Sequence, residues 1–449
     1  MSTIEKHDMT QGKILLPLVS FTIPLVLGNL FQLTYNAADS VIVGKYVGEQ
    51  ALAAVGTSTP IMNIAILLIS GMCMGASVLM SSQYGAKDYD TLSRQISTTM
   101  LAGCGFSVVF SLLMLLLANP VLRLIRVPET AIPEAAAYLR IIFMGLIFTF
   151  MYNFLANTVR ALGDSKTPLY FLVTSAFLNI FGDLFFVVVL RWGVAGSAIA
   201  TVCSEGLCCL LCGIYIKKKI PLLCLGKKWW VFDKSLLGKT VSYGSTSAMQ
   251  QVCLQLGKLI IQSVVNTQGV AVMAAFTAVN RVDDFAYTPQ QNIGHAMTTF
   301  LAQNKGAGHK ERMKKGFQTG LLIELVYSIG LFCVIWGLAP QIMTLFAEDG
   351  DAQVVSLGIS YLHLISWMYI LPGLTNGVQG FFRGIGDLKV TLYSTFMNMF
   401  GRVVAVFVMI RLLQMEFASL AWANMVGWIV MLLFEVPLLV KSMRNGECG

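Results

Sequence analysis

Gln32-Leu-Thr-Tyr35-Asn36-Ala-Ala-Asp39 is a polar stretch inside a long apolar segment of the chain, residues 14–43. Its four large polar side chains follow one another at intervals of three and four residues, so on a helix they form a single polar stripe. The segment is long enough to cross a bilayer, which takes about 20 residues. A carboxylate in hydrocarbon costs about 3 kcal/mol or more. Asp39 therefore needs a partner, a proton, a bound cation or a water-filled cavity, and each of these indicates a transport protein.

The composition indicates that the whole chain, and not only this segment, is suited to a membrane. Of its 449 residues, 56% are hydrophobic and 12% are charged, and the mean hydropathy is +0.71. A soluble domain carries about 25% charged residues. Several apolar runs exceed the length that a membrane helix needs. We therefore expect an all-α polytopic membrane protein with twelve transmembrane helices, at residues 14–43, 51–80, 95–118, 135–158, 168–190, 194–216, 236–265, 270–299, 316–339, 353–382, 388–411 and 416–440.

The basic residues cluster in short loops between the apolar runs, so the net charge of +8 reflects membrane topology, and we expect no nucleic-acid partner. With twelve spans, 22 Lys and Arg residues fall on the side of the two termini and 5 fall on the other side. This bias predicts a multi-pass protein of the cell (inner, cytoplasmic) membrane with both termini in the cytoplasm. We expect a monomer whose surroundings are the lipid bilayer.

An internal repeat divides the chain. Arg160-Ala-Leu-Gly-Asp164-Ser-Lys166 recurs as Arg383-Gly-Ile-Gly-Asp387-Leu-Lys389 at an offset of 223 residues, and Asn153 matches Asn376 at the same offset. With six spans in each half, the halves are parallel repeats related by an axis along the membrane normal. We expect two six-helix lobes (6+6) around a central cavity, as alternating access requires, with an N-terminal lobe at 1–216, a cytoplasmic basic linker at 217–239 and a C-terminal lobe at 240–449.

Further polar residues lie inside the predicted spans of the first half. Asn179 and Asp183 are four residues apart and share one helix face, as do Thr201 and Glu205. Carboxylates with amide and hydroxyl oxygens suit a proton or a hard cation such as Na⁺. The alternative is that these acids make hydrogen bonds or ion pairs between helices. The same choice holds for Asn153 and Asn157, which could line a substrate cavity or bond to neighbouring helices, since they too are four residues apart.

Two stretches of the chain look like enzyme motifs, but each lacks a glycine that its motif requires. Gly103-Cys-Gly105 begins like a dinucleotide fingerprint, but Val108 stands where its third glycine belongs. Gly238-Lys239-Thr240 resembles the end of a phosphate-binding loop, but Asp233 stands where the first glycine of that motif belongs. We expect no enzyme activity, no cofactor and no metal beyond Na⁺ at the coupling site. Without an ATP site, uphill transport would be driven by an H⁺ or Na⁺ gradient, worth about 2.3 kcal/mol per charge for each 100 mV.

Five motifs together resemble the MATE (multidrug and toxic compound extrusion) family, and most of all its DinF-like bacterial branch. They are Asp39-Ser-Val-Ile-Val-Gly44, Ala51-Leu-Ala-Ala-Val-Gly56, Gln83-Tyr-Gly-Ala86, Arg160-Ala-Leu-Gly-Asp164-Ser-Lys-Thr-Pro168 and Asn179-x-x-x-Asp183. The resemblance covers nearly the whole chain. It implies a cation-coupled (H⁺ or Na⁺) antiporter that exports organic, cationic or amphipathic small molecules by alternating access through a 6+6 helical fold.

The resemblance also implies site residues. The cation or proton site of the first lobe matches Asp39, Asn179, Asp183 and Thr201, and the substrate cavity matches Gln32, Tyr35, Asn153, Asn157 and Arg281. Some other branches carry acidic coupling residues in the seventh and tenth spans. Lys258 and His363 occupy those regions here, which argues against a second-lobe cation site at those positions.

A lipid-linked oligosaccharide flippase of a related superfamily remains an alternative. A flippase moves a pyrophosphate-linked anion and needs unpaired basic residues at its cavity, for which Lys258, Arg281 and Arg402 are candidates. Asp39 and Asp183 favour the antiporter. A receptor or scaffold would need a sizeable soluble domain or long loops, and the predicted spans leave little chain for either.

Overall fold

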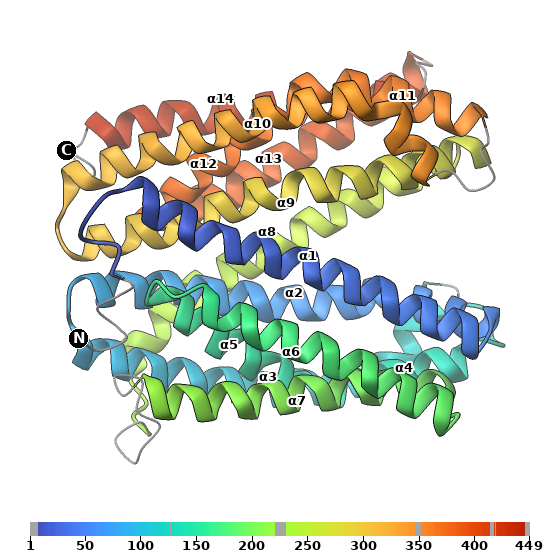
Figure 1. Ribbon diagram of the computed structural model, residues 1–449, viewed down its shortest axis with the longest axis horizontal. Coiled ribbons are helices and arrows are strands. Elements are labelled where there is room, and N and C mark those ends of the chain that lie inside the picture. Colours follow the sequence, from blue (N-terminus) through green and yellow to red (C-terminus); the bar gives the residue numbers. More distant parts are fainter. Residues whose placement is uncertain are drawn as a thin grey trace. The chain divides into compact units, whose positions relative to one another are not determined.

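All regular secondary structure in the described part of the chain is helical (Figure 1). A computed structural model describes residues 8–125, 127–220, 230–346, 352–413, 417 and 419–444. The helices group into two compact units. One unit holds Ile23–Ala248, and the other holds Met9–Thr22 together with the chain from Met249 onward. The border between the units therefore falls within a helix, after Ala248. Part of the predicted basic linker, residues 221–229, lies outside the described residues.

The first unit contains the helices of the first sequence repeat. They are α1 (Leu15–Tyr46), α2 (Glu49–Gly85), α3 (Tyr89–Leu124), α4 (Ile132–Met144), α5 (Leu146–Ala161), α6 (Lys166–Asp183), a π-helical end η2 (Leu184–Val189) and α7 (Gly193–Lys219). The start of α1 belongs to the second unit, and the start of α8 (Lys234–Val265) belongs to the first.

The second unit repeats this order. It contains the rest of α8 and then α9 (Val270–Gly306), α10 (Lys310–Phe346), α11 (Ala352–Ser366), a 3₁₀ turn η6 (Trp367–Tyr369), α12 (Ile370–Ile385), α13 (Leu388–Phe407), a π-helical end η7 (Val408–Leu412) and α14 (Ser419–Arg444). In both units, therefore, the helix that corresponds to the fifth span of its repeat ends in a π-helical turn.

The described helices confirm the predicted class of polytopic helical membrane protein. Within the described ranges, nine helices or joined helices are long and apolar enough to cross a membrane, and the bent pair α4–α5 makes a tenth. The remaining two predicted spans, the seventh and eighth, form the long helices α8 and α9, which are more polar than the others. Each of the twelve predicted spans thus corresponds to a helix or a helix pair.

Two predicted spans are interrupted rather than continuous. The fourth span bends by 47° between α4 and α5 at Gly145. A Cβ atom at Gly145 would lie 2.5 Å from a methyl carbon of Val202, so the glycine lets the bend lie against α7. Phe143, Leu146 and Phe150 on either side of the bend are buried in the core of the unit. The tenth span is interrupted by η6, between α11 and α12.

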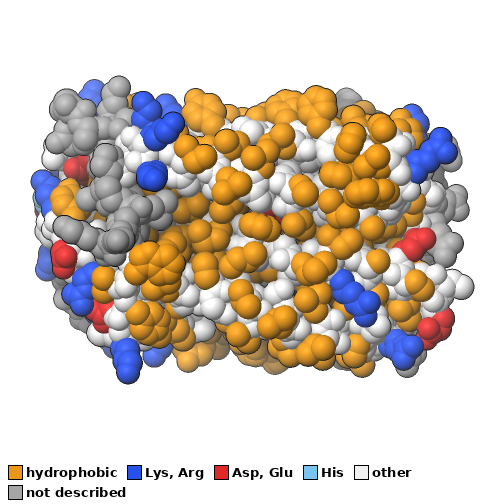
Figure 2. Space-filling view, turned by 90° about the horizontal axis from the view of Figure 1, so that it is seen from below, with side chains coloured by type: hydrophobic (Ala, Val, Ile, Leu, Met, Phe, Trp, Pro, Cys, Tyr) orange, Lys and Arg blue, Asp and Glu red, His pale blue; other side chains and the backbone are white. Residues whose placement is uncertain are grey.

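The outer surface agrees with a membrane environment. Figure 2 shows hydrophobic side chains over the middle of the face in view, while most charged side chains gather toward its two ends. On α3, Val109, Leu112 and Leu116 are more than half exposed. Such an apolar exposed band is expected where helices face lipid rather than water.

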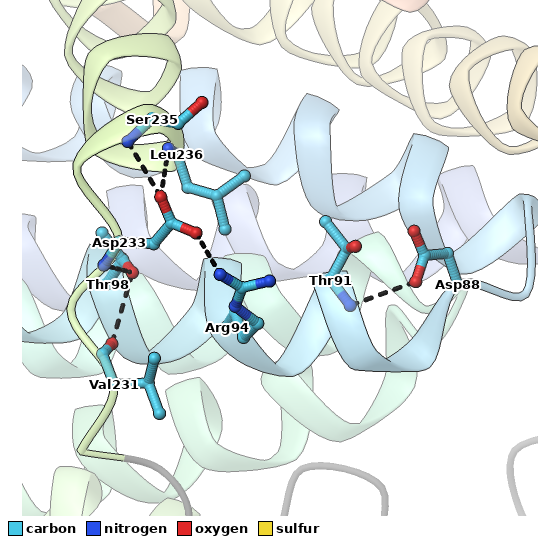
Figure 3. Close-up of polar contacts among 8 residues, drawn as sticks. All are labelled: Asp88, Thr91, Arg94, Thr98, Val231, Asp233, Ser235 and Leu236. Carbon is cyan, nitrogen blue, oxygen red and sulfur yellow. Dashed lines mark hydrogen bonds and ion pairs between the residues drawn. The ribbon is translucent and has the colours of Figure 1, made fainter.

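Hydrogen bonds join the start of α8 to α3 within the first unit (Figure 3). The Asp233 carboxylate accepts hydrogen bonds from the backbone N–H groups of Ser235 (2.8 Å) and Leu236 (3.3 Å), and it pairs with Arg94 at 2.5 Å. The Asp233 N–H donates to Thr98 Oγ1 at 3.1 Å. One carboxylate therefore caps the first turn of α8 and ties it to the neighbouring helix.

The start of α3 is capped in the same way. Asp88 accepts a hydrogen bond from the backbone N–H of Thr91 at 3.1 Å (Figure 3). The hydrogen bonds that Thr91 donates lower the pKa of this exposed carboxyl. The cap fixes the point at which the chain turns from α2 into α3.

Replacing Asp233 tests this junction. Asp233→Ala removes the cap and the ion pair, so we expect the free energy of unfolding to fall by about 1 kcal/mol, a typical value for a lost cap. The partly exposed ion pair adds only about 0–1 kcal/mol. Asp233→Asn keeps a cap acceptor and should lose less. Thermal unfolding of the purified protein measures both. Equal melting of the Ala variant and the wild type would show that the cap contributes nothing.

Candidate functional site

Close packing of α6 on α7 builds the polar site of the first unit. A Cβ atom at Gly182 would lie 2.9 Å from the Ala200 side chain, so the glycine allows the two helices to approach closely. This contact places Asn179 and Asp183 on the face of α6 that meets α7. Asp183 is the last residue of α6, directly before the π-helical turn η2. Such turns inside helices are frequent at functional sites.

Two carboxyl groups meet at this site. Asp39 Oδ1, from α1, accepts a hydrogen bond from Ser197 Oγ of α7 at 2.7 Å. Asp183 is fully buried and lies within hydrogen-bond reach of Asp39. Neither Asp183 oxygen receives a hydrogen bond from the described residues. Two facing carboxylates repel each other and are costly to bury, so the pair needs a proton or a cation.

Amide and hydroxyl groups complete the oxygen set. Asn179 Nδ2 donates to Thr201 Oγ1 at 3.2 Å, and Thr201 Oγ1 donates to the Ser197 carbonyl at 3.1 Å. The other side-chain atom of this amide, Asn179 Oδ1, is buried and accepts no hydrogen bond from the described residues. The structure thus brings together all four residues of the predicted coupling site: Asp39, Asn179, Asp183 and Thr201. Carboxylate, amide and hydroxyl oxygens fit a proton or Na⁺, and no larger cluster of metal-ligating side chains is found among the described residues.

The predicted cavity residues of the first unit extend this site along its helices. Tyr35, on α1, hydrogen-bonds with Gln32 and lies near both Asp39 and Glu205. Glu205, on α7, accepts a hydrogen bond from Thr149 of α5. Thr149 thereby joins the acidic site to the helix that carries Asn153 and Asn157.

Among the described residues, the amide nitrogens of Asn153 and Asn157 bond within α5 rather than to neighbouring helices. Asn153 Nδ2 donates to the Thr149 carbonyl at 2.9 Å, and Asn157 Nδ2 donates to the Asn153 carbonyl at 2.8 Å, both within α5. Both side chains are half-buried. Their role in a substrate cavity stays a prediction.

Two residues of the site were missed from the sequence. Ser197 lies one helical turn before Thr201, so the spacing that paired Thr201 with Glu205 could have found it. Tyr138, from α4, lies near Asp39 and Asp183 in a buried position. Its place could not be read from the sequence, because it depends on how α4 bends against α7.

Of the three basic candidates in the second unit, Lys258 and Arg402 have acidic neighbours and Arg281 does not pair with an acid among the described residues. Lys258 pairs with Asp284 at 3.3 Å. Arg402 lies near the buried Asp283, which also accepts a hydrogen bond from Tyr369 at 2.6 Å. Arg281, on α9, is exposed, and no ion pair joins it to another described residue.

Removing the Ser197 hydroxyl tests the geometry of the acidic pair. A hydrogen bond to a charged group contributes about 1.5–3 kcal/mol, so we expect Ser197→Ala to slow transport about tenfold to a hundredfold. Ser204→Ala is the matched control, because this buried hydroxyl on the same helix bonds only to the Thr201 carbonyl among the described residues. A rate in Ser197→Ala equal to that of the control would remove Ser197 from the site. Initial transport rates at equal protein amounts measure the difference.

Long apolar helices in two repeated units, with carboxyl groups enclosed at the depth of the spans, define a polytopic membrane transporter.

The chain belongs to the MatE family, because the sequence model of that family matches residues 24–185 and 247–409. It is 32% identical to the "Probable multidrug resistance protein YpnP" of Bacillus subtilis (strain 168), over 87% of this chain and 86% of that protein. It is also 23% identical to the "Probable multidrug resistance protein NorM" of Thermotoga maritima, over 92% of this chain and 89% of that protein.

Solved structures show the same fold. An outward-facing multidrug resistance MATE family transporter of the MOP superfamily matches with a TM-score of 0.91 and 22% identity, covering 100% of this chain and 99% of that chain. A MOP superfamily transporter from Pyrococcus furiosus matches with a TM-score of 0.91 and 21% identity, covering 99% of each chain. The predicted family and fold are therefore confirmed.

Proposed function

We propose that this MatE-family transporter exports organic, cationic or amphipathic compounds from the cell in exchange for H⁺ or Na⁺. It works as a monomer in the cell membrane, with both termini in the cytoplasm. The coupling ion binds at Asp39, Asn179, Asp183 and Thr201, and alternating access moves the organic compound. Relatives named for multidrug resistance or multidrug export support the substrate class.

One observation carries the coupling proposal: the fully buried Asp183 carboxyl faces Asp39 and receives no donor from the described residues. A buried carboxyl pair of this kind can hold a proton or a cation and release it when the site opens to water. Loading and release on opposite sides of the membrane is what exchange requires.

The residues between the coupling site and α5 supply the proposed link to the organic compound. Tyr35 lies near Asp39 and Glu205, and Glu205 bonds to Thr149. A cation that binds beside Tyr35 would meet the aromatic ring and the negative charge together, and both favour an organic cation. Ion release and compound binding can thus compete for the same negative charge.

The flippase alternative is less well supported. A flippase for a pyrophosphate-linked anion needs free basic groups, but Lys258 is paired with Asp284 and Arg402 lies near Asp283. Arg281 alone of the three candidates retains an exposed charge without an ion pair to the described residues. One such group makes only a weak anion site, and the facing carboxyls of Asp39 and Asp183 favour a cation instead.

Uptake into inverted membrane vesicles tests the proposal. Vesicles containing the protein are given an acid lumen or a Na⁺-filled lumen, and the accumulation of the organic cation ethidium is followed by fluorescence. Vesicles without the protein are the control. We expect accumulation with at least one of the two gradients and its collapse when that gradient is removed. Accumulation that depends on neither gradient would contradict ion-coupled exchange.

A further inference from the structure

Three elements of the second unit meet around Gly373, at the beginning of α12. A Cβ atom at Gly373 would lie 2.9 Å from Ser328 Oγ, 3.2 Å from Gln290 Nε2 and 3.4 Å from Glu324 Oε2. Gln290 comes from α9, whereas Glu324 and Ser328 come from α10. The glycine therefore leaves room for three polar side chains to converge in the interior of the unit, beside the interrupted tenth span.

The carboxyl group of Glu324 is enclosed in this cluster. The residue is 1% exposed, and neither carboxyl oxygen receives a hydrogen bond from the described residues. Gln290 Oε1 is likewise buried and without a donor in the described chain. The cluster thus contains three buried acceptor oxygens, and none of them receives a hydrogen bond from the described residues.

The hydrogen-bond donors of the cluster, Gln290 and Ser328, bond to each other and to backbone carbonyls at or near the helix interruption. Gln290 Nε2 donates to Ser328 Oγ at 3.0 Å and to the Tyr369 carbonyl at 2.8 Å. Ser328 Oγ can donate to the Glu324 backbone carbonyl at 2.7 Å or to the Tyr369 carbonyl at 3.3 Å. Tyr369 is the last residue of η6 and the N-cap of α12, so these side chains bond to a backbone carbonyl at the helix interruption itself.

The charged and titratable groups around Glu324 offer no cation to balance a carboxylate. Tyr327, on the same helix, lies close enough to interact with Glu324, and its hydroxyl donates to the Ala286 carbonyl at 3.1 Å. From η6, the Tyr369 hydroxyl donates to Asp283, an acid on α9. No Lys or Arg forms an ion pair with Glu324 among the described residues. An ionised carboxylate there would be unpaired and dry, which is strongly unfavourable.

The first unit fills the corresponding place with apolar groups. At the offset of 220 residues that aligns the prolines of α3 and α10, Glu324 corresponds to Cys104. At the repeat offset of 223, Gly373 corresponds to Phe150, whose ring packs directly on Gly103 of α3. A ring and a thiol thus stand where the second unit has a glycine and a carboxyl. The fold does not require a polar cluster at this place.

We propose that Glu324 is a proton-binding site of the second unit, in which the carboxylic acid donates its O–H to Gln290 Oε1. When the O–H bond breaks and the proton passes to water, the carboxylate attracts the Gln290 amide and the Ser328 hydroxyl. The amide then leaves the Tyr369 carbonyl, the hydroxyl no longer has a hydrogen to offer that carbonyl, and the junction of α11 and α12 loosens. The proton thus controls the helix interruption. The site lies at neither Lys258 nor His363, and it does not depend on the exchange proposed for Asp39.

Infrared difference spectroscopy of the purified protein tests the bound proton. The spectrum of the wild type minus that of Glu324→Gln at neutral pH should contain the C=O band of a protonated carboxyl, which shifts in D₂O. Glu311→Gln, at the exposed start of α10, is the matched control and should remove an ionised carboxylate band instead. Gln290→Leu removes the acceptor and should move the protonated band to higher wavenumber, which also provides a test if Glu324→Gln does not fold.

Two results would overturn the site. A carboxylate band in place of the protonated band at neutral pH would show that Glu324 is ionised. Loss of the protonated band on adding Na⁺ at constant pH would show an alkali-cation site. Neither result bears on ion-driven ethidium uptake, so failure here is distinct from failure of the proposed exchange.

Hydrogen exchange tests the proposed control of the interruption. As the pH is raised, the amides of residues 367–373 should exchange faster in the wild type than in Glu324→Gln, which keeps a neutral side chain. The comparison at each pH cancels the intrinsic effect of base on exchange. Identical pH profiles in the two proteins would show that the proton does not control the junction.

Discussion

Asp39→Asn is expected to abolish ion-coupled export while the protein still folds. The amide has nearly the same shape as the carboxyl, but it carries no charge and cannot exchange a proton. Two unit charges about 4 Å apart attract by about 4 kcal/mol at an effective dielectric constant of 20. Losing that attraction corresponds to a roughly thousandfold weaker hold on the coupling ion. Ethidium accumulation in vesicles, normalised to the amount of folded protein, measures the loss.

Asp90→Asn is the control for this substitution. Asp90 is an exposed acid in the first turn of α3, so its neutralisation should leave transport unchanged. Full activity in Asp39→Asn would remove Asp39 from the mechanism. Loss of activity in both variants would indicate a general effect of charge rather than a site.

Gly75→Leu is expected to have the largest effect on folding. Gly71 and Gly75 lie one turn apart on α2 and face the backbone of α8 within the first unit. A Cβ atom at Gly75 would lie 2.3 Å from the Tyr243 carbonyl oxygen, and one at Gly71 would lie 2.6 Å from the Ala248 Cα. Small residues at this spacing let membrane helices pack closely. Overpacking costs about 1–3 kcal/mol and more where backbone must move, so we expect a loss near 3 kcal/mol.

The measurement is the thermal unfolding midpoint of the purified protein, together with the yield of monodisperse material. Gly105→Leu is the matched control, because a Cβ atom at this exposed glycine of α3 would meet nothing within 4 Å. The control should melt like the wild type. If Gly75→Leu also melts like the wild type, α2 and α8 do not pack as closely as described.

The acidic site could be predicted in large part from the sequence. A carboxyl in an apolar helix is costly wherever it points, so Asp39 and Asp183 indicated a site before any contact was known. Helical spacing then placed Asn179 beside Asp183 on one face. The resemblance to MATE proteins added Thr201. The structure joins these residues through Ser197, which helical spacing alone could have added. Their role in coupling stays a prediction.

The twelve-span fold was also within reach, because long apolar runs and the bias of basic residues report directly on membrane helices. The interruptions of the fourth and tenth spans, in contrast, could not be predicted from the sequence. Gly145 looks like any helical glycine until the packing of Val202 against it is known. In the same way, the room that Gly373 leaves for Glu324 depends on the approach of α9, α10 and α12, which no local pattern encodes.

We propose above all that the facing carboxyls of Asp39 and Asp183 hold the coupling ion. The most direct test measures ion release when ethidium binds to the purified protein. A pH indicator in weakly buffered solution reports protons, and preloaded radioactive Na⁺ reports sodium. We predict that the wild type releases one of the two ions, that Asp90→Asn does the same, and that Asp39→Asn and Asp183→Asn release neither. Undiminished release from both site variants would contradict the account.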